Sequence, residues 1–234
     1  MTREMLRIEG LNAWYGESHI LHGVDLVVNE GEVVTLLGRN GAGRTTTLRA
    51  IVGLTGTRKG SIRIKGEEAI RLAPHKVARL GVGYCPEERG IFASLSAEEN
   101  LMLPPAVGPG GMSVEEIYGM FPNLKERANS PGTRLSGGEQ QMLAVARILR
   151  TGARLLLLDE MSEGLAPVIV QKLAEMIVTL KAKGYTIVLV EQNFRFAAPL
   201  ADRFYVMEHG RIVRQFARQE LQDNLGMLQE YLGV

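Results

Sequence analysis

The stretch GRNGAGRT, Gly38–Thr45, follows an apolar run that ends at Leu37 and precedes a helical pattern over 45–52. Its three glycines let the backbone bend so that successive amides point inward. These amides and the N-terminus of the following helix would form a cradle for an anion. The stretch therefore predicts a phosphate-binding turn, in which Thr45 offers its hydroxyl to Mg²⁺. A glycine-rich turn without a ligand is the alternative interpretation.

One position departs from the phosphate-loop pattern, because Arg44 stands where a lysine is expected. Arginine keeps the positive charge, but its planar guanidinium is larger than an ammonium and does not replace it freely at a tight phosphate site. We therefore expect the exchange to affect turnover more than nucleotide binding.

Short apolar runs alternate with helical patterns around this turn. The runs that predict strands lie at 24–28, 32–37, 61–65, 82–85, 155–159, 186–191, 203–207 and 211–215. The helical patterns lie at 45–52, 74–79, 97–103, 113–121, 136–150 and 167–183. Such alternation favours an α/β fold with a mostly parallel sheet covered on both faces. The segment 92–150 holds no convincing strand, so we interpret it as a helical insertion.

Composition narrows the class of protein. The chain has 234 residues, with 27 Lys and Arg against 26 Asp and Glu, which gives a net charge of +1. This balance argues against a protein that binds nucleic acid through a basic face. A single cysteine, Cys85, allows no internal disulfide, and no apolar run approaches the length of a membrane span. The N-terminus lacks the apolar core of a secretory signal, so these features predict a soluble, intracellular protein.

The run LLLLDE, 155–160, is a buried-strand pattern that ends in two carboxylates. Ligands of open α/β sheets bind at the carboxyl ends of the strands. In phosphate-loop nucleotidases an aspartate here holds Mg²⁺, and an adjacent acid can polarise water. Because side chains alternate along a strand, Asp159 and Glu160 can take different roles. A solvated strand end is the alternative.

A third motif, LSGGEQQ at 135–141, leads into a helical pattern. Ser136 is placed to cap that helix, with Glu139 three residues later, as in a capping box. The amides of Gly137 and Gly138 at the helix N-terminus would suit another phosphate. A capped helix start without a ligand is the alternative.

The three motifs, in this order, resemble those of the ATP-binding subunits of ABC transporters, over essentially the whole chain. Within that family the sequence most resembles the second ATPase component of branched-chain amino-acid importers. The strings that support this are WYGESHILHGV (14–24), SEGLAP (162–167), VEQN (190–193) and ADRFYVMEHGRIV (201–213).

The resemblance implies a fold and a domain organisation. It implies a RecA-like P-loop NTPase core with a mostly parallel sheet, an N-terminal antiparallel β subdomain and an inserted α-helical subdomain. The chain would be a single ABC ATPase domain, 1–234. Residues 1–91 and 151–234 would form the ATP-binding core, and residues 92–150 would form the helical subdomain with the LSGGEQQ motif.

The resemblance also implies roles for residues of this sequence. Glu160 would be the base that polarises water, and Gln192 stands where most members have a histidine near the γ-phosphate. An amide donates a hydrogen bond there but holds no charge. Mg²⁺ would be bound by Thr45, Asp159 and Glu87. ATP would be bound by Tyr15, through stacking on adenine, and by Gly38, Arg39, Asn40, Gly41, Ala42, Gly43, Arg44, Thr45, Thr46, Ser136, Gly137 and Gly138.

The expected function is ATP hydrolysis that powers an importer of branched-chain or other amino acids. The expected partners are a second ABC ATPase, identical or different, two transmembrane permease subunits and, indirectly, a periplasmic substrate-binding protein, with no nucleic acid. The chain would lie in the cytoplasm, peripheral to the bacterial inner membrane. Three alternatives remain: a nucleotide-gated switch with little turnover, the ATPase of a related amide or urea importer, and a soluble ATPase that acts on nucleic acid or ribosomes.

Overall fold

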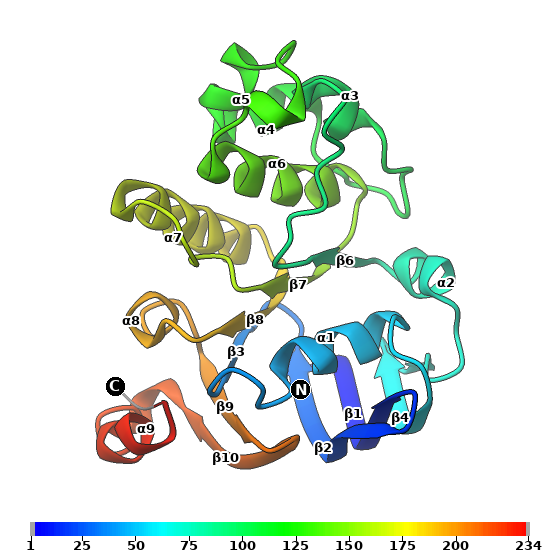
Figure 1. Ribbon diagram of the computed structural model, residues 1–234, viewed down its shortest axis with the longest axis vertical. Coiled ribbons are helices and arrows are strands. Elements are labelled where there is room, and N and C mark those ends of the chain that lie inside the picture. The colour runs from blue at the N-terminus through cyan, green and yellow to red at the C-terminus, as the bar shows by residue number, and fades with distance from the viewer. Residues whose placement is uncertain (1–2, 233–234) are drawn as a thin grey trace.

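A mostly parallel sheet forms the centre of the molecule. The computed structural model describes residues 3–232, and its central sheet has the strand order β10-β9-β3-β8-β7-β6 (Figure 1). Its strands are β3 (Val33–Leu37), β6 (Val82–Cys85), β7 (Leu155–Asp159), β8 (Thr186–Glu191), β9 (Arg203–Glu208) and β10 (Arg211–Ala217). Every neighbouring pair is parallel except β9 and β10, which form an antiparallel hairpin from the predicted strands 203–207 and 211–215.

The three central strands are apolar because they are covered on both faces. All residues of β3, β7 and β8 are buried. Helix α7 (Pro167–Ala182) covers one side of the sheet, and helix α1 (Arg44–Val52) lies between it and the second sheet (Figure 1). The α/β class with a mostly parallel sheet is thereby confirmed.

The second sheet is antiparallel and comes mostly from the N-terminal part of the chain. Its order is β2-β1-β4-β5, with β1 (Glu4–Tyr15), β2 (Ser18–Asn29), β4 (Arg58–Ile64) and β5 (Glu67–Glu68). The antiparallel subdomain is confirmed, but the sequence predicted only part of it, the runs 24–28 and 61–65. Strand β1 was missed because its pairing with β2 shifts register at four places, which breaks the period-two pattern of a regular strand.

Short helices fill the segment between β6 and β7. They are α3 (Ala97–Met102), α4 (Val114–Met120), α5 (Pro122–Glu126) and α6 (Gly137–Arg150), and they lie together at one end of the molecule (Figure 1). Residues 92–150 form one isolated bridge, between Ser96 and Pro131, and no strand, as expected for the helical insertion. Helix α5 was not predicted, because its five residues are too few to show a period.

The remaining helices are α2 (Pro74–Arg79), α8 (Phe194–Ala197) and α9 (Leu225–Leu232), with 3₁₀ turns at Gly132–Arg134 and Arg218–Glu220. Helix α9 was also missed. Its sequence holds Gly226, a poor helix former, and packing of the buried Leu228 and Leu232 onto the core helps to stabilise it. The outermost residues of the predicted domain, 1–2 and 233–234, lie outside the described residues. No helix within 3–232 has both the length and the apolar character to cross a membrane.

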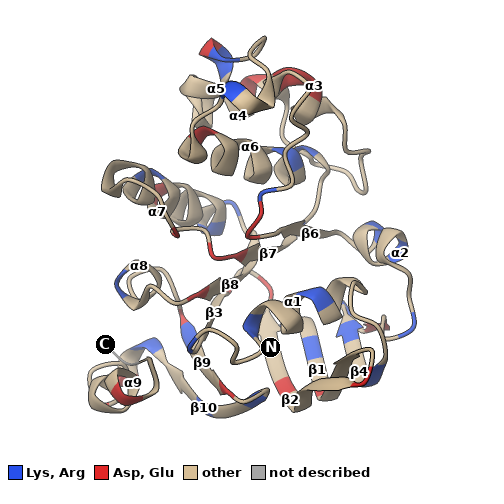
Figure 2. Ribbon diagram, in the orientation of Figure 1, with Lys and Arg blue, Asp and Glu red and all other residues tan. Residues whose placement is uncertain are grey.

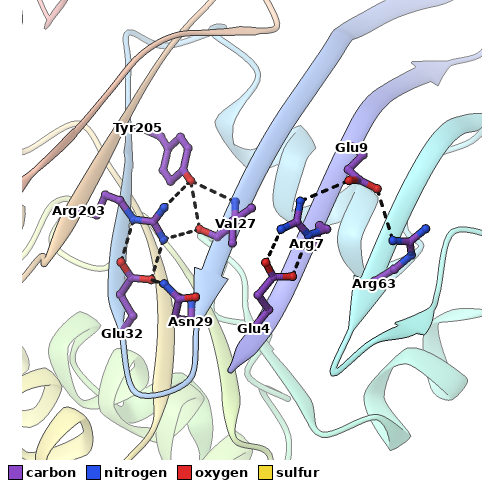
Figure 3. Close-up of polar contacts among 9 residues, drawn as sticks. All are labelled: Glu4, Arg7, Glu9, Val27, Asn29, Glu32, Arg63, Arg203 and Tyr205. Carbon is purple, nitrogen blue, oxygen red and sulfur yellow. Dashed lines mark hydrogen bonds and ion pairs between the residues drawn. The ribbon is translucent and has the colours of Figure 1, made fainter. Parts of the chain in front are cut away.

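A partly buried polar network joins the two sheets (Figure 3). Arg203 of β9 contacts Glu32 twice, with Nε 2.8 Å from Oε1 and Nη2 2.7 Å from Oε2. The same guanidinium donates to the Val27 carbonyl of β2 at 2.7 Å and to the Tyr205 hydroxyl at 3.0 Å. The network lies at the edge where β3 and β9 begin, so it fixes the sheets at the end opposite the phosphate loop.

We expect Arg203→Ala to lower the free energy of unfolding by about 2–4 kcal/mol, because it leaves the Glu32 carboxylate largely buried without its partner. Arg7→Ala is the control, since Arg7 pairs with Glu4 and Glu9 on the solvent side of β1 (Figure 3), where ion pairs add little. Urea unfolding at pH 7 measures both variants. Equal stabilities for the two would contradict this role of the network.

Candidate functional site

The predicted chemical groups meet where three parallel strands end. Leu37 of β3 pairs with Glu191 of β8, and Val190 of β8 pairs with Asp159 of β7. The loop after β3 therefore lies beside both carboxylates of the LLLLDE run, and Figure 2 shows acidic residues at the ends of β7 and β8 near the basic start of α1. A cavity of about 410 Å³ opens there, lined by Tyr15, Ile20, Asn40, Gly41, Ala42, Gly43, Arg44, Thr45, Thr46, Glu87, Glu160 and Glu163.

The glycines of the phosphate loop are required by its geometry. A Cβ on Gly38 would lie 2.4 Å from the Met207 carbonyl oxygen. Gly43 has φ +106°, and a Cβ there would lie 2.9 Å from Leu21 Cδ2. Gly43 also precedes α1 without a side-chain cap, so the first amides of this helix keep their donors for a ligand.

Arg44 lies in a tight, buried position at the start of α1. Its side chain is 5% exposed, and its Nη2 atom lies 2.7 Å from Oε1 of Glu160 and 3.1 Å from Oδ1 of Asn40. The Nη1 atom is buried and has no hydrogen-bond partner. An unpaired buried guanidinium nitrogen is costly, so a phosphate oxygen in this cavity would satisfy it. The site therefore fits an anion despite the absence of the usual lysine.

Thr45 and Asp159 lie together below the loop. The Thr45 hydroxyl donates to Oδ1 of Asp159 at 3.0 Å, and the Tyr84 hydroxyl donates to Oδ2 at 3.2 Å. Burial raises the pKa of Asp159, while these two hydrogen bonds oppose the rise. A hydroxyl and a carboxylate are oxygen ligands of the kind that Mg²⁺ takes when substrate phosphates supply the rest. Accordingly, no cluster of three His, Cys, Asp or Glu side chains able to hold a metal occurs within residues 3–232.

The Glu160 side chain forms an ion pair and a hydrogen bond, and its backbone has a positive φ angle. Besides its ion pair with Arg44, its Oε2 atom accepts a hydrogen bond from the Gln192 backbone amide at 3.3 Å. Burial raises the pKa of Glu160, while Arg44 and this amide oppose the rise. Its φ is +48°, in the left-handed region that residues other than glycine rarely adopt.

The side chain of Gln192 does not join this cavity. It is exposed and lines a separate cavity of about 430 Å³ with Phe194 of α8 and Leu228 of α9. Only the Gln192 backbone reaches Glu160. Arg39 also points elsewhere, because its Nη2 atom donates to the Glu230 carbonyl of α9 at 3.3 Å.

The LSGGEQQ residues lie outside this cavity, at the N-terminus of α6. The predicted capping box is present: Ser136 Oγ accepts from the Glu139 amide at 3.3 Å, and Glu139 Oε2 accepts from the Ser136 amide at 2.7 Å. A Cβ on Gly138 would lie 2.8 Å from Ile169 of α7, which explains the need for glycine. Ser136, Gly137 and Gly138 are thus not among the residues that line the cavity of their own chain.

Sequence reasoning missed three residues that surround the site, namely Tyr84, Ile20 and Glu163. Tyr84 lies on β6, next to β7, and the strand prediction for 82–85 offered a signal for it. Ile20 lies in the first half of β2, which the strand prediction did not reach. Glu163 belongs to a loop and carries no signal of its own.

The comparisons with known proteins agree with this geometry. The ABC transporter family matches residues 21–163. The branched-chain amino acid transport ATP-binding protein BraG of Pseudomonas aeruginosa is 41% identical, over 98% of this chain and all of that protein. The lipopolysaccharide export ATP-binding protein LptB of Escherichia coli is 32% identical, over 97% of each chain.

A solved structure supports the fold. It is a dimeric ATP-binding cassette in a post-hydrolysis state with ADP and phosphate, with a TM-score of 0.78 and 24% identity over 92% of this chain and 99% of that chain. The family match and the full-length relatives together show that this chain is an ATP-binding subunit of the ABC transporter family.

Proposed function

We propose that this chain hydrolyses ATP to power the import of branched-chain or other amino acids. One observation carries the proposal: the phosphate loop, Asp159 and Glu160 surround one cavity, in which a buried nitrogen of Arg44 lacks a partner. A glycine-rich turn without a ligand would leave that nitrogen unsatisfied.

The roles follow from where each group lies. The loop 38–46 would hold the phosphates, and Tyr15, which is 38% exposed at the end of β1, would stack on adenine. Thr45, Asp159 and Glu87 would hold Mg²⁺, which supplies positive charge to the phosphate oxygens. Glu160 would accept a proton from the attacking water on its carboxylate, because its raised pKa makes it a better base than an exposed glutamate.

Arg44 links nucleotide binding to the release of this base. In the structure its guanidinium pairs with Glu160. A phosphate at the loop competes for the same guanidinium, because arginine binds phosphate and carboxylate through the same fork. Phosphate binding would therefore free the Glu160 carboxylate to accept a proton from the attacking water.

A second ATPase subunit completes the site in this proposal. Ser136, Gly137 and Gly138 lie away from their own cavity at the N-terminus of α6, where Ser136 is exposed. They would face the nucleotide of a partner arranged head to tail. The cassette of similar fold described above is itself dimeric. The partner would be a second copy or a different ABC ATPase.

The membrane partners would dock beside the helical segment. A groove of about 490 Å³ lies between α1 and α6, lined in part by Arg49, Leu54, Arg89 and Arg147. The neighbouring Phe92, Met102 and Leu103 are about half-exposed apolar side chains, of the kind that contact a partner. One of the two permease subunits would bind here and hold the chain at the cytoplasmic face of the inner membrane, with a periplasmic binding protein delivering the substrate.

The similarity to BraG, at 41% identity, favours amino acids as the cargo over the lipopolysaccharide of LptB, at 32%. Amides or urea are the nearest alternative cargo. A nucleotide-gated switch is a second candidate function, and the Arg44–Glu160 ion pair favours it, because a pair that persists with ATP bound would block turnover.

We expect Glu160→Gln to bind ATP but to lower kcat by about 100- to 10,000-fold, because the amide cannot accept the proton of water. The variant should also accumulate as an ATP-bound dimer, which size-exclusion chromatography detects. Glu175→Gln, on the exposed face of α7, is the matched control. In cells that lack the chromosomal copy, uptake of labelled leucine should return with the wild type and not with Glu160→Gln. Hydrolysis by Glu160→Gln at the wild-type rate would show that this role is wrong.

We expect Arg44→Met to weaken ATP binding by roughly 10- to 100-fold, because a charge-assisted hydrogen bond is lost. Arg63→Met, on the exposed side of β4, should bind as the wild type does. Isothermal titration calorimetry measures both. Unchanged affinity in Arg44→Met would contradict phosphate binding by this residue. Arg44→Lys separates the two candidate functions, since a large gain in turnover over the wild type would favour the switch.

A further inference from the structure

The two residues after Glu160 are buried and are held by side chains from other elements. Met161 and Ser162 are 0% and 7% exposed. One contact comes from the end of β8 and the other from the middle of α6. Neither contacting side chain has a role in the hydrolysis described above.

Glu191 holds Ser162 with both oxygens of its carboxyl group. The Ser162 amide donates to Oε1 at 3.0 Å, and the Ser162 hydroxyl contacts Oε2 at 2.9 Å. Glu191 is fully buried, and burial raises its pKa to about 8, so that it is largely neutral at pH 7. The next residue, Gln192, donates its amide to Glu160. The end of β8 therefore contacts both Glu160 and the residue two positions after it.

Gln141 of α6 contacts Met161. It is 1% exposed, and its Nε2 atom lies 2.9 Å from Sδ of Met161. Its Oε1 atom accepts a hydrogen bond from Nε of Arg89 at 3.0 Å. Because Arg89 can only donate, this contact fixes the amide orientation in which Nε2 faces Met161.

We propose that Glu191 and Gln141 are positioning residues that clamp Met161–Ser162 and thereby aim the Glu160 carboxylate. A left-handed backbone at a glutamate persists only where surrounding contacts impose it. The Glu160 amide itself donates to the Val190 carbonyl at 2.9 Å, and the side-chain hydrogen bonds from Glu191 and Gln141 hold the two residues that follow. The proposal rests on the proposed hydrolysis by Glu160. It adds two residues that do not line the cavity at the phosphate loop.

The first experiment measures phosphate release against ATP concentration with the full chain. Gln141→Met keeps the side-chain size and removes the amide, and Glu191→Leu removes the carboxyl group. Each should lower kcat tenfold or more and leave KM within about twofold, because a small misplacement of a catalytic group reduces the chemical step. Glu191→Gln should keep kcat within about twofold, since its amide can replace the neutral carboxyl. Ser162→Ala, which removes only one contact, covers the case that Glu191→Leu does not fold.

The second experiment separates this proposal from the proposed hydrolysis. Hydrogen exchange of the amides of residues 161–163, in the protein without nucleotide, should be at least tenfold faster in Gln141→Met and Glu191→Leu, and unchanged in Glu191→Gln and in the surface control Glu175→Gln. Two results would overturn the clamp. One is that Gln141→Met and Glu191→Leu exchange these amides at the wild-type rate. The other is that the wild type hydrolyses ATP and both variants have the same kcat as the wild type. An inactive wild type whose variants show the faster exchange would overturn the proposed hydrolysis alone.

Discussion

The carboxyl ends of three neighbouring parallel strands, β3, β8 and β7, determine where each charged group of the site lies. These strands are buried on both faces, so polar chemistry can only collect where they end. The phosphate loop leaves β3 there, and Glu191 and Asp159 end β8 and β7 beside it. At the opposite edge the Arg203 network fixes the antiparallel sheet to the central one and keeps this frame in place.

Within this frame the distinctive feature of the chain is electrostatic. An arginine at the phosphate-loop position pairs with the carboxylate that would serve as base, and both side chains are at least nine-tenths buried. A buried pair of this kind persists only while neither charge finds a better partner. Phosphate offers Arg44 such a partner, and the clamp from Gln141 and Glu191 keeps Glu160 in place when the pair opens. In the proposed mechanism, nucleotide binding and the chemical step would therefore both depend on the Arg44 guanidinium.

The sequence predicted the elements whose signal is local. The loop 38–45, the capping box at Ser136 and the apolar strands before Asp159 and Glu191 all depend on neighbouring residues. The sequence did not predict the features that depend on contacts between distant parts of the chain. Strand β1 is irregular because bulges fit it between β2 and β4, and the Arg44–Glu160 pair and the outward side chain of Gln192 arise only in the folded protein.

In the proposed function the site hydrolyses ATP repeatedly, although Arg44 stands where a lysine is expected and Gln192 where a histidine is expected. Phosphate release by the purified wild-type chain with ATP and Mg²⁺, followed over a range of protein concentrations, tests it most directly. Release should continue well beyond one phosphate per chain, and the rate per chain should rise with protein concentration, because two subunits would share each nucleotide in the proposed arrangement. Release that ends at or below one phosphate per chain, while ATP still binds, would contradict the claim.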